Sequence, residues 1–178
     1  MKNMKKTILL ICILITQFGW SQSDGLLKNR QLRLNFINPG FTFEKSISNS
    51  SSLLFQSEII YGFNVRGNET THLFAPLIET QYRYYYNLKS RKEKQKNISN
   101  NSGSYLAATT MYGLKPFNND NFISMYDGLT FGALWGFQKT YKSKLNIGAE
   151  IGLGYNMSEN QPKKVVHLIG IKFGYVVF

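Results

Sequence analysis

The sequence predicts an all-β chain: an eight-stranded antiparallel transmembrane β-barrel that remains after removal of a signal peptide. Apolar residues recur at every second position over long runs, which indicates strands. The runs exceed the roughly 5 to 6 residues of a typical soluble strand and match the roughly 9 to 11 that cross a bilayer. The second face of these runs holds glycine and polar residues, so the apolar face is expected to point outward, as in outer-membrane barrels.

The N-terminal segment is predicted to be a secretory signal peptide, residues 1–21, which leaves 22–178 as the barrel domain. A basic start, "MKNMKK", precedes the apolar run "TILLICILITQFGW", and Gly19 and Ser21 are the small residues of a cleavage site. The only cysteine, Cys12, lies inside this segment. The barrel domain is therefore expected to have neither a disulfide framework nor a cysteine metal site, and the predicted location is the outer membrane.

Eight strands are predicted in the barrel domain. An even number lets both ends of the barrel chain lie on one side, and the tight connections Ser48–Ser50 and Lys142–Lys144 then fall on the periplasmic side, where such barrels have short turns. The first two strands are the least certain, since "NFINPGFTFEKSI" also fits one bent strand with Pro39 at a bulge. The strands are expected near Leu26–Ile37, Phe41–Ser48, Ser52–Arg66, Leu73–Leu88, Ser104–Leu114, Gly128–Tyr141, Leu145–Met157 and Lys164–Phe178.

Tyrosines gather where the fourth strand is expected to leave the membrane. These are Tyr82, Tyr84, Tyr85 and Tyr86, with Tyr141 at the end of the sixth strand. Tyrosine favours the membrane interface because its ring tolerates acyl chains while its hydroxyl needs water. The cluster is interpreted as an aromatic girdle.

Charged residues occur on the predicted inner face. Eight strands leave an interior just wide enough for side chains, and unpaired buried charges are costly, so these charges are expected to pair with one another. A plug of structural salt bridges and a gated ion path are both compatible with such a set. The predicted lumen network consists of Arg33, Glu44, Glu58, Glu79, Arg83, Glu150 and Lys172, with Gln56 and Gln138 nearby.

A basic run follows the fourth strand, in "NLKSRKEKQKNISNNSGS". Its cations are Lys89, Arg91, Lys92, Lys94 and Lys96. Strand parity places it on the periplasmic side, where it could contact anionic lipid headgroups or a periplasmic partner, or form a solvated, mobile loop. Nucleic acid is not an expected partner, although basic runs do bind it, because an exported chain meets little of it.

Catalytic residues are sparse, and no enzyme is predicted. The two histidines, His72 and His167, are far apart, which argues against a metal site. A lipid-modifying enzyme would need a nucleophilic hydroxyl beside His167, and Ser124 or Ser158 would reach it only through loop folding. No phosphate loop or dinucleotide fingerprint is present, so no cofactor is expected.

Several segments together resemble an uncharacterised group of small outer-membrane β-barrel proteins from Bacteroidetes-type bacteria. They are the "SQ" that ends the signal, "NPGFTFEKSISNSSSL", "YRYYYNLKSRKEKQKNISNNSGSYLA", "LWGFQKTYKSKLNIGAEIGLGY" and "GIKFGYVVF". The resemblance implies fold and location but no site residues. The architecture is also similar to the small eight-stranded barrels of enterobacterial outer membranes, which implies outer-membrane lipids and the barrel assembly machinery as partners.

The predicted function is that of a non-enzymatic outer-membrane barrel with a plugged lumen, which contributes to envelope integrity or to adhesion through its loops. The alternatives are a narrow pore or transporter for small solutes and, less favoured, a lipid-modifying enzyme. A soluble, lipocalin-like exported barrel is the rival fold. It would need its polar face outside, and the glycines on the narrow inner face argue against it.

Overall fold

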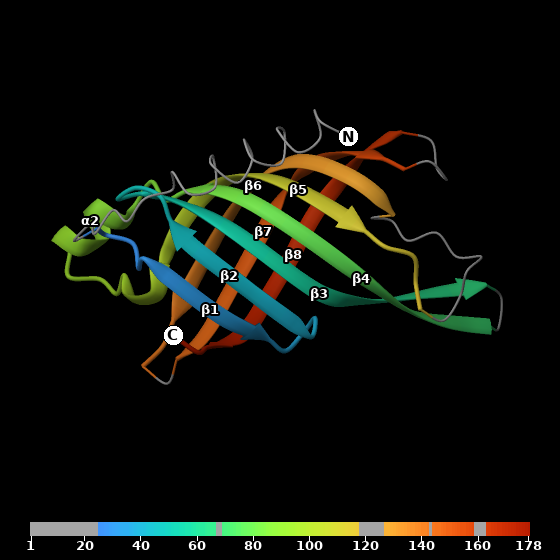
Figure 1. Cartoon of the computed structure of the whole chain (residues 1–178), viewed down its shortest axis with the longest axis horizontal. Helices are drawn as coiled ribbons and strands as arrows, with labels where there is room; N and C mark the ends of the chain where they lie inside the picture. Colours follow the sequence, from blue (N-terminus) through green and yellow to red (C-terminus); the bar gives the residue numbers. More distant parts are fainter. Residues whose placement is uncertain (1–24, 67–68, 118–126, 143, 159–162) are drawn as a thin grey trace, which may run out of the picture.

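Eight strands form one closed antiparallel sheet in the computed structural model, which describes residues 25–66, 69–117, 127–142, 144–158 and 163–178. Each strand pairs with the next along the chain and the last pairs with the first (Figure 1). This confirms the predicted eight-stranded antiparallel barrel, while the predicted signal peptide lies outside the described residues. The strands are β1 (Arg30–Asn35), β2 (Gly40–Ser46), β3 (Ser51–Arg66), β4 (Glu69–Tyr84), β5 (Gly103–Gly113), β6 (Gly128–Thr140), β7 (Leu145–Met157) and β8 (Lys164–Val176).

Two strands, rather than one bent strand, form at the start of the barrel. Asn35 at the end of β1 pairs with Gly40 at the start of β2, so the chain reverses over residues 36–39. Pro39 lies in this turn, where its missing N–H removes no bond from the sheet ladder. The β1–β2 hairpin is consequently the shortest in the barrel wall.

Side chains alternate along the strands as the sequence predicts. On β6, Phe131 and Trp135 are exposed on the outer surface, whereas Thr130, Leu134 and Gln138 are buried inside. A strand presents successive side chains to opposite faces of its sheet, so closure of the barrel sends one set inward and leaves the apolar set outside.

The barrel closes through a short antiparallel ladder between β1 and β8. The paired residues extend from Arg33 to Asn35 on β1 and from Gly174 to Val176 on β8. Three further backbone bonds extend this ladder. Leu32 N donates to the Phe178 carbonyl at 3.1 Å, Val177 N to the Leu32 carbonyl at 2.8 Å, and Phe36 N to the Phe173 carbonyl at 2.8 Å. The C-terminal residues are thus part of the closing ladder.

A short helix and a 3₁₀ turn cover one end of the barrel. The helix α2 (Leu88–Glu93) and the turn η1 (Ser99–Asn101) connect β4 to β5 at the end where the C-terminus lies (Figure 1). Leu88 and Leu27 are buried there in one cluster with Tyr85 and Tyr105. Among the described residues, no helix combines the length and hydropathy that crossing a membrane requires.

The predicted limits of the first and fourth strands are wrong by several residues. The first strand was expected over Leu26–Ile37, but β1 spans Arg30–Asn35. The fourth strand was expected over Leu73–Leu88, but β4 spans Glu69–Tyr84 and Leu88 begins α2. Leucine, lysine, arginine and glutamate all favour helix, and burial of Leu88 in the mouth of the barrel holds the helix in place.

Gly136 is expected to be essential for packing of the lumen. A Cβ at this position would lie 2.6 Å from the ring of the buried Tyr105. We expect Gly136→Val to destabilise the barrel by about 1–3 kcal/mol through overpacking, measured by urea unfolding in detergent micelles. Gly170→Ala is the control, since its Cβ would meet Glu150 only at 3.8 Å; equal effects of the two substitutions would contradict the prediction.

Candidate functional site: a charged network inside the barrel

Charged side chains from six strands meet inside the barrel. The structure places all seven predicted lumen residues on the inner face: Arg33 on β1, Glu44 on β2, Glu58 on β3, Glu79 and Arg83 on β4, Glu150 on β7 and Lys172 on β8. Glu44 and Arg83 are completely buried, and Glu58 and Lys172 are partly buried. Closure of the sheet is what brings residues so far apart in sequence together.

The guanidinium of Arg83 lies at the centre of the network. Its Nη2 donates to Glu150 Oε1 at 2.6 Å, its Nε to Gln81 Oε1 at 2.6 Å, and its Nη1 to Gln138 Oε1 at 3.1 Å. The carbon of the guanidinium also lies 4.1 Å from the ring centroid of Tyr105. Three nitrogens with partners and a cation–π contact offset the desolvation of a completely buried cation.

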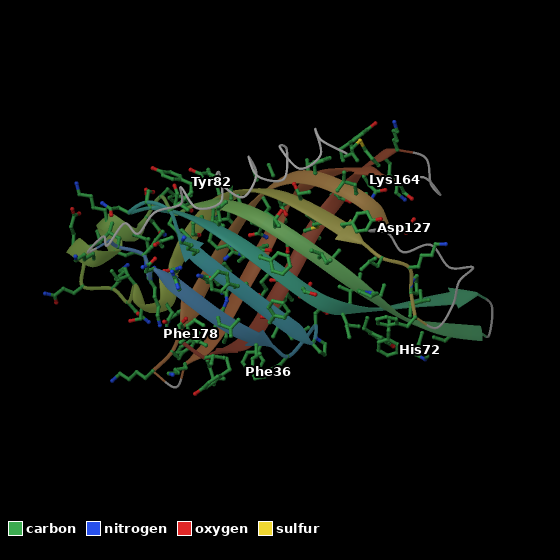
Figure 2. The ribbon with its side chains drawn as sticks, viewed as in Figure 1. Phe36, His72, Tyr82, Asp127, Lys164 and Phe178 are labelled. Carbon is green, nitrogen blue, oxygen red and sulfur yellow. The ribbon has the colours of Figure 1, made fainter. Side chains whose placement is uncertain are left out.

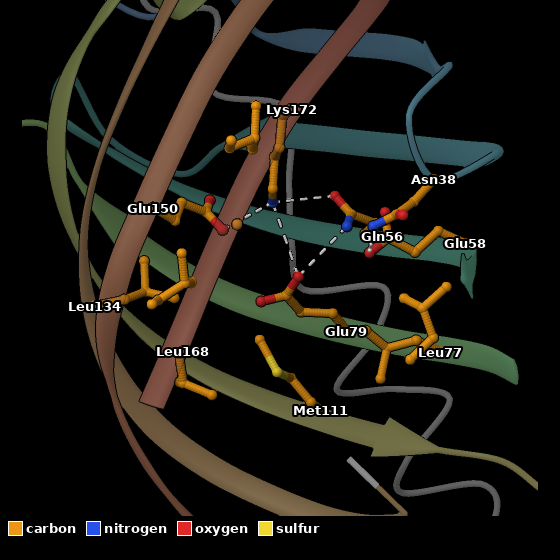
Figure 3. Close-up of a pocket in the computed structure, with 14 residues that line it drawn as sticks. Asn38, Gln56, Glu58, Leu77, Glu79, Met111, Leu134, Glu150, Leu168 and Lys172 are labelled. Carbon is orange, nitrogen blue, oxygen red and sulfur yellow. Dashed lines mark hydrogen bonds and ion pairs between the residues drawn. The ribbon is translucent and has the colours of Figure 1, made fainter. Parts of the chain in front are cut away.

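Glu150 links Arg83 to a second cation, Lys172. Glu150 Oε1 also accepts a hydrogen bond from the Tyr105 hydroxyl at 2.6 Å, and Lys172 Nζ lies 3.0 Å from Glu150 Oε2. Lys172 Nζ further donates to Gln56 Oε1 at 3.2 Å and lies 3.8 Å from Glu79 Oε2, as Figure 3 shows. One lysine therefore connects strands β3, β4 and β7.

Glu44 forms the second anionic centre, nearer to α2. It accepts hydrogen bonds from Ser52 Oγ at 2.7 Å and from the Tyr85 hydroxyl at 2.6 Å. Its Oε2 lies 3.7 Å both from Arg33 Nη2 and from Arg83 Nη1. These contacts join the two anionic centres through Arg83.

Tyr85 is not part of an aromatic girdle, which corrects the prediction. Tyr82, Tyr84 and Tyr86 are exposed on the outer surface, but Tyr85 is buried in the lumen. Burial, together with the charge of Glu44, raises the pKa of its hydroxyl, so the group remains a proton donor to the carboxylate. Tyr85 lies two residues after the inward-facing Arg83, so the alternation places both side chains on the same face. This parity could have identified Tyr85 as a lumen residue from the sequence.

Several uncharged lumen residues were missed by sequence reasoning. Gln81 bonds to both Glu79 and Arg83, and Thr109 Oγ1 donates to Glu79 Oε1 at 2.8 Å. Toward the other end of the barrel the inner face becomes aliphatic, with Leu77, Met111, Leu134, Val166 and Leu168 in one buried cluster. The same cluster includes Tyr105, Tyr85 and Leu88, so buried apolar side chains extend past the charged network to the α2 end.

The basic run includes α2 and is hydrogen-bonded to the rest of the barrel, and we call it the cap. Headgroup contact, a periplasmic partner and a solvated, mobile loop all stay predictions for it. Asn97 Nδ2 donates to the Thr140 carbonyl at 2.7 Å, and Gln138 Nε2 donates to the Asn101 carbonyl at 2.9 Å. Lys28 N donates to Asn101 Oδ1 at 2.7 Å. These bonds attach the segment to β6 and to the start of the described chain.

The cations of this cap differ in their surroundings. Lys89, Lys92, Lys94 and Lys96 are exposed. Arg91 is partly buried and donates from Nη2 and Nε to the Asn97 carbonyl, at 2.8 and 3.2 Å. Arg91 therefore stabilises the cap itself, while the four lysines form an exposed basic surface.

The histidines lie away from the lumen network. His72 is on β4, where its Nδ1 lies 2.6 Å from the Tyr61 hydroxyl, and His167 is exposed on β8. Ser158 donates instead to Asp127 Oδ2 at 2.8 Å, and Ser124 lies outside the described residues. Across the described part of the chain there is no group of three or more His, Cys, Asp or Glu side chains that could hold a metal ion.

No protein family model, curated protein or solved structure matches the chain. The resemblance to small outer-membrane barrels of Bacteroidetes-type bacteria therefore stays a prediction.

Loss of the Tyr85 hydroxyl tests whether the network contributes to stability. Tyr85→Phe removes a donor to a buried carboxylate, and we expect it to lower the free energy of unfolding by about 1.5–3 kcal/mol. Tyr84→Phe is the matched control on the outer surface, with an expected effect under about 0.5 kcal/mol. Urea unfolding in micelles measures both, and a Tyr85→Phe protein as stable as the control would contradict the network's role.

Proposed function

We propose that the chain is a non-enzymatic outer-membrane β-barrel with a plugged lumen, which contributes to envelope integrity or to adhesion through its loops. The observation that carries this proposal is the inverted distribution of side chains. Large apolar residues cover the outer surface of the strands, whereas charged and amide side chains fill the inside. A water-exposed barrel gains nothing from this arrangement, while a lipid-exposed barrel requires it.

The short connections between β2 and β3 and between β6 and β7 lie at the α2 end, and such barrels have short turns on the periplasmic side. Tyr82, Tyr84, Tyr86 and Tyr141 are exposed toward the end that carries α2, and Trp135 Nε1 donates to the Tyr86 hydroxyl at 2.8 Å. Such an aromatic set suits the membrane interface. We assign this end to the periplasmic side, so that a cleaved signal peptide and the barrel assembly machinery would deliver the chain into the membrane.

The exposed lysines of the cap fit the same orientation. Lys89, Lys92, Lys94 and Lys96 would lie next to the periplasmic leaflet, where anionic headgroups attract basic side chains. A periplasmic partner with an acidic surface would use the same residues. The ordered backbone of the cap would present these lysines in a fixed arrangement to either of them.

The plugged lumen follows from the pairing of its charges. A hydrated ion path would have to separate Arg83 from Glu150 and Lys172 from its three partners, and a buried charge without its partner is strongly unfavourable. Leu27 and Leu88 add an apolar layer at the α2 end. We therefore prefer a plug to the narrow pore, the alternative that the sequence also allows.

A charge on the outer surface distinguishes a membrane barrel from a soluble one. Ile151 is exposed on the outer face of β7. If β7 crosses a membrane, Ile151→Arg is expected to lower the free energy of unfolding by about 2–4 kcal/mol near the bilayer midplane. On a water-exposed surface, the same substitution should change it by less than about 0.5 kcal/mol. Unfolding from lipid vesicles, followed by heat-modifiable gel mobility, measures the difference.

Ile47→Arg is the matched control, because Ile47 lies beyond β2 at the α2 end and is also exposed. Near the interface, the substitution to arginine is expected to lower the free energy of unfolding by about 0–1 kcal/mol. Equal, negligible effects of both substitutions, with the wild-type protein in the soluble fraction, would overturn the membrane assignment.

A further inference from the structure

The barrel wall is notched between β3 and β8. The short β1–β2 hairpin ends at residues 36–39, while β3 and β8 continue beyond it (Figure 1). The β2–β3 ladder ends at Glu58 and the β1–β8 ladder at Gly174, with one backbone bond beyond each, from Ile59 N to the Pro39 carbonyl at 2.9 Å and from Phe36 N to the Phe173 carbonyl at 2.8 Å. Past these points the neighbouring edges of β3 and β8 have no strand between them, and we call this opening the lateral notch.

Side chains around the lateral notch are apolar and unusually exposed. The outward residues of β8 along it, Ile169 and Ile171, are 69% and 66% exposed, compared with 57% for Ile151 on β7, which has a strand on each side. The β1–β2 turn below it presents Phe36, at 50% exposure, and Ile37, at 53%. Figure 2 shows Phe36 projecting from the outer surface. A turn with these residues suits hydrocarbon better than water.

A cavity of about 80 Å³ reaches this opening from the lumen. It is lined by inward-facing Leu168 and Lys172 and also by outward-facing Ile169 and Ile171 of the same strand. Its lining also includes residues from both edges of the lateral notch, with Glu58 and Ile60 on β3 and Gly170 and Lys172 on β8. The cavity therefore lies directly behind the notch, and Leu77, Met111 and Leu134 form its apolar side.

Glu58 brings a further carboxyl group into this cavity. The other three lumen carboxylates have ion pairs, but across the described residues Glu58 has none. Asn38 Nδ2 donates to Glu58 Oε1 at 3.3 Å, and both residues line the cavity (Figure 3). Lys172, the nearby cation, is already held by Glu79 and Glu150. With every carboxyl ionised, this network has four anions and three cations, so either a proton on Glu58 or a cation beside it would bring the charges to balance.

We propose that the lateral notch binds a membrane amphiphile with a primary ammonium head. The ammonium would pair with Glu58, and the alkyl chain would pass between β3 and β8 along Ile169 and Ile171 into the surrounding lipid. This inference rests on the proposed membrane location, because only a bilayer supplies such a ligand along the wall. An amphiphile with an anionic head would instead meet the excess carboxylate and be repelled.

Native mass spectrometry of the full chain, released from tetraethylene glycol monooctyl ether micelles, tests the proposal with dodecylammonium as the probe. The wild-type protein is expected to retain the probe, and Glu58→Gln to weaken its retention at least tenfold. Glu93→Gln, the same substitution on exposed α2, should leave retention unchanged. Dodecyl sulfate, with the same chain and opposite charge, should bind no better than dodecylammonium binds to Glu58→Gln.

A second variant blocks the cavity without touching the carboxylate. Gly170 lines the cavity, and a Cβ there makes only ordinary contacts, so Gly170→Val is expected to fold and to lose the probe. Equal retention by Glu58→Gln, Gly170→Val and Glu93→Gln would overturn the proposal, as would a dimer mass in place of the adduct, which would assign the notch to a second copy.

Heat-modifiable gel mobility separates the amphiphile site from the proposed membrane location. A protein that never inserts as a barrel overturns both proposals. An inserted barrel with no selective adduct overturns only the amphiphile site.

Discussion

A completely buried guanidinium constrains the rest of this barrel. Arg83 needs several acceptors inside the protein, because a buried cation without them costs several kcal/mol. Its partners, Gln81, Gln138 and Glu150, come from β4, β6 and β7. Because these side chains must converge on one group, they favour the observed register over a slip of one residue, which would turn every inward side chain outward.

The same constraint explains features farther from the charge. The ring centroid of Tyr105 lies 4.1 Å from the guanidinium carbon of Arg83, its hydroxyl donates to Glu150, and its ring occupies the space in front of Gly136. The charged network thus replaces part of a hydrophobic core, and the buried cluster around Leu134 and Tyr105 packs beside it. With the interior filled in this way, apolar residues are left for the outer surface, where the proposed bilayer would cover them.

Period-two alternation was sufficient to predict the strands, their inward charges and the closed sheet, because those depend on local pattern and on the small space inside eight strands. It was not sufficient for Tyr85, where four tyrosines and one arginine in residues 82–86 suggested a surface cluster, although parity placed the ring inside. The cap at Leu88 and the lateral notch also escaped prediction. Both depend on how far individual strands extend, and strand ends are set by tertiary contacts such as Asn97 with Thr140.

A double-mutant cycle between Arg83 and Glu150 tests most directly whether this buried pair organises the lumen. Arg83→Met and Glu150→Gln are each expected to lower the free energy of unfolding by about 3–5 kcal/mol, because each leaves the other charge buried without its partner. The double variant should lose less than the sum of the two, with a coupling of about 1.5–3 kcal/mol in urea unfolding from vesicles. Effects that add to within about 0.5 kcal/mol would contradict the account.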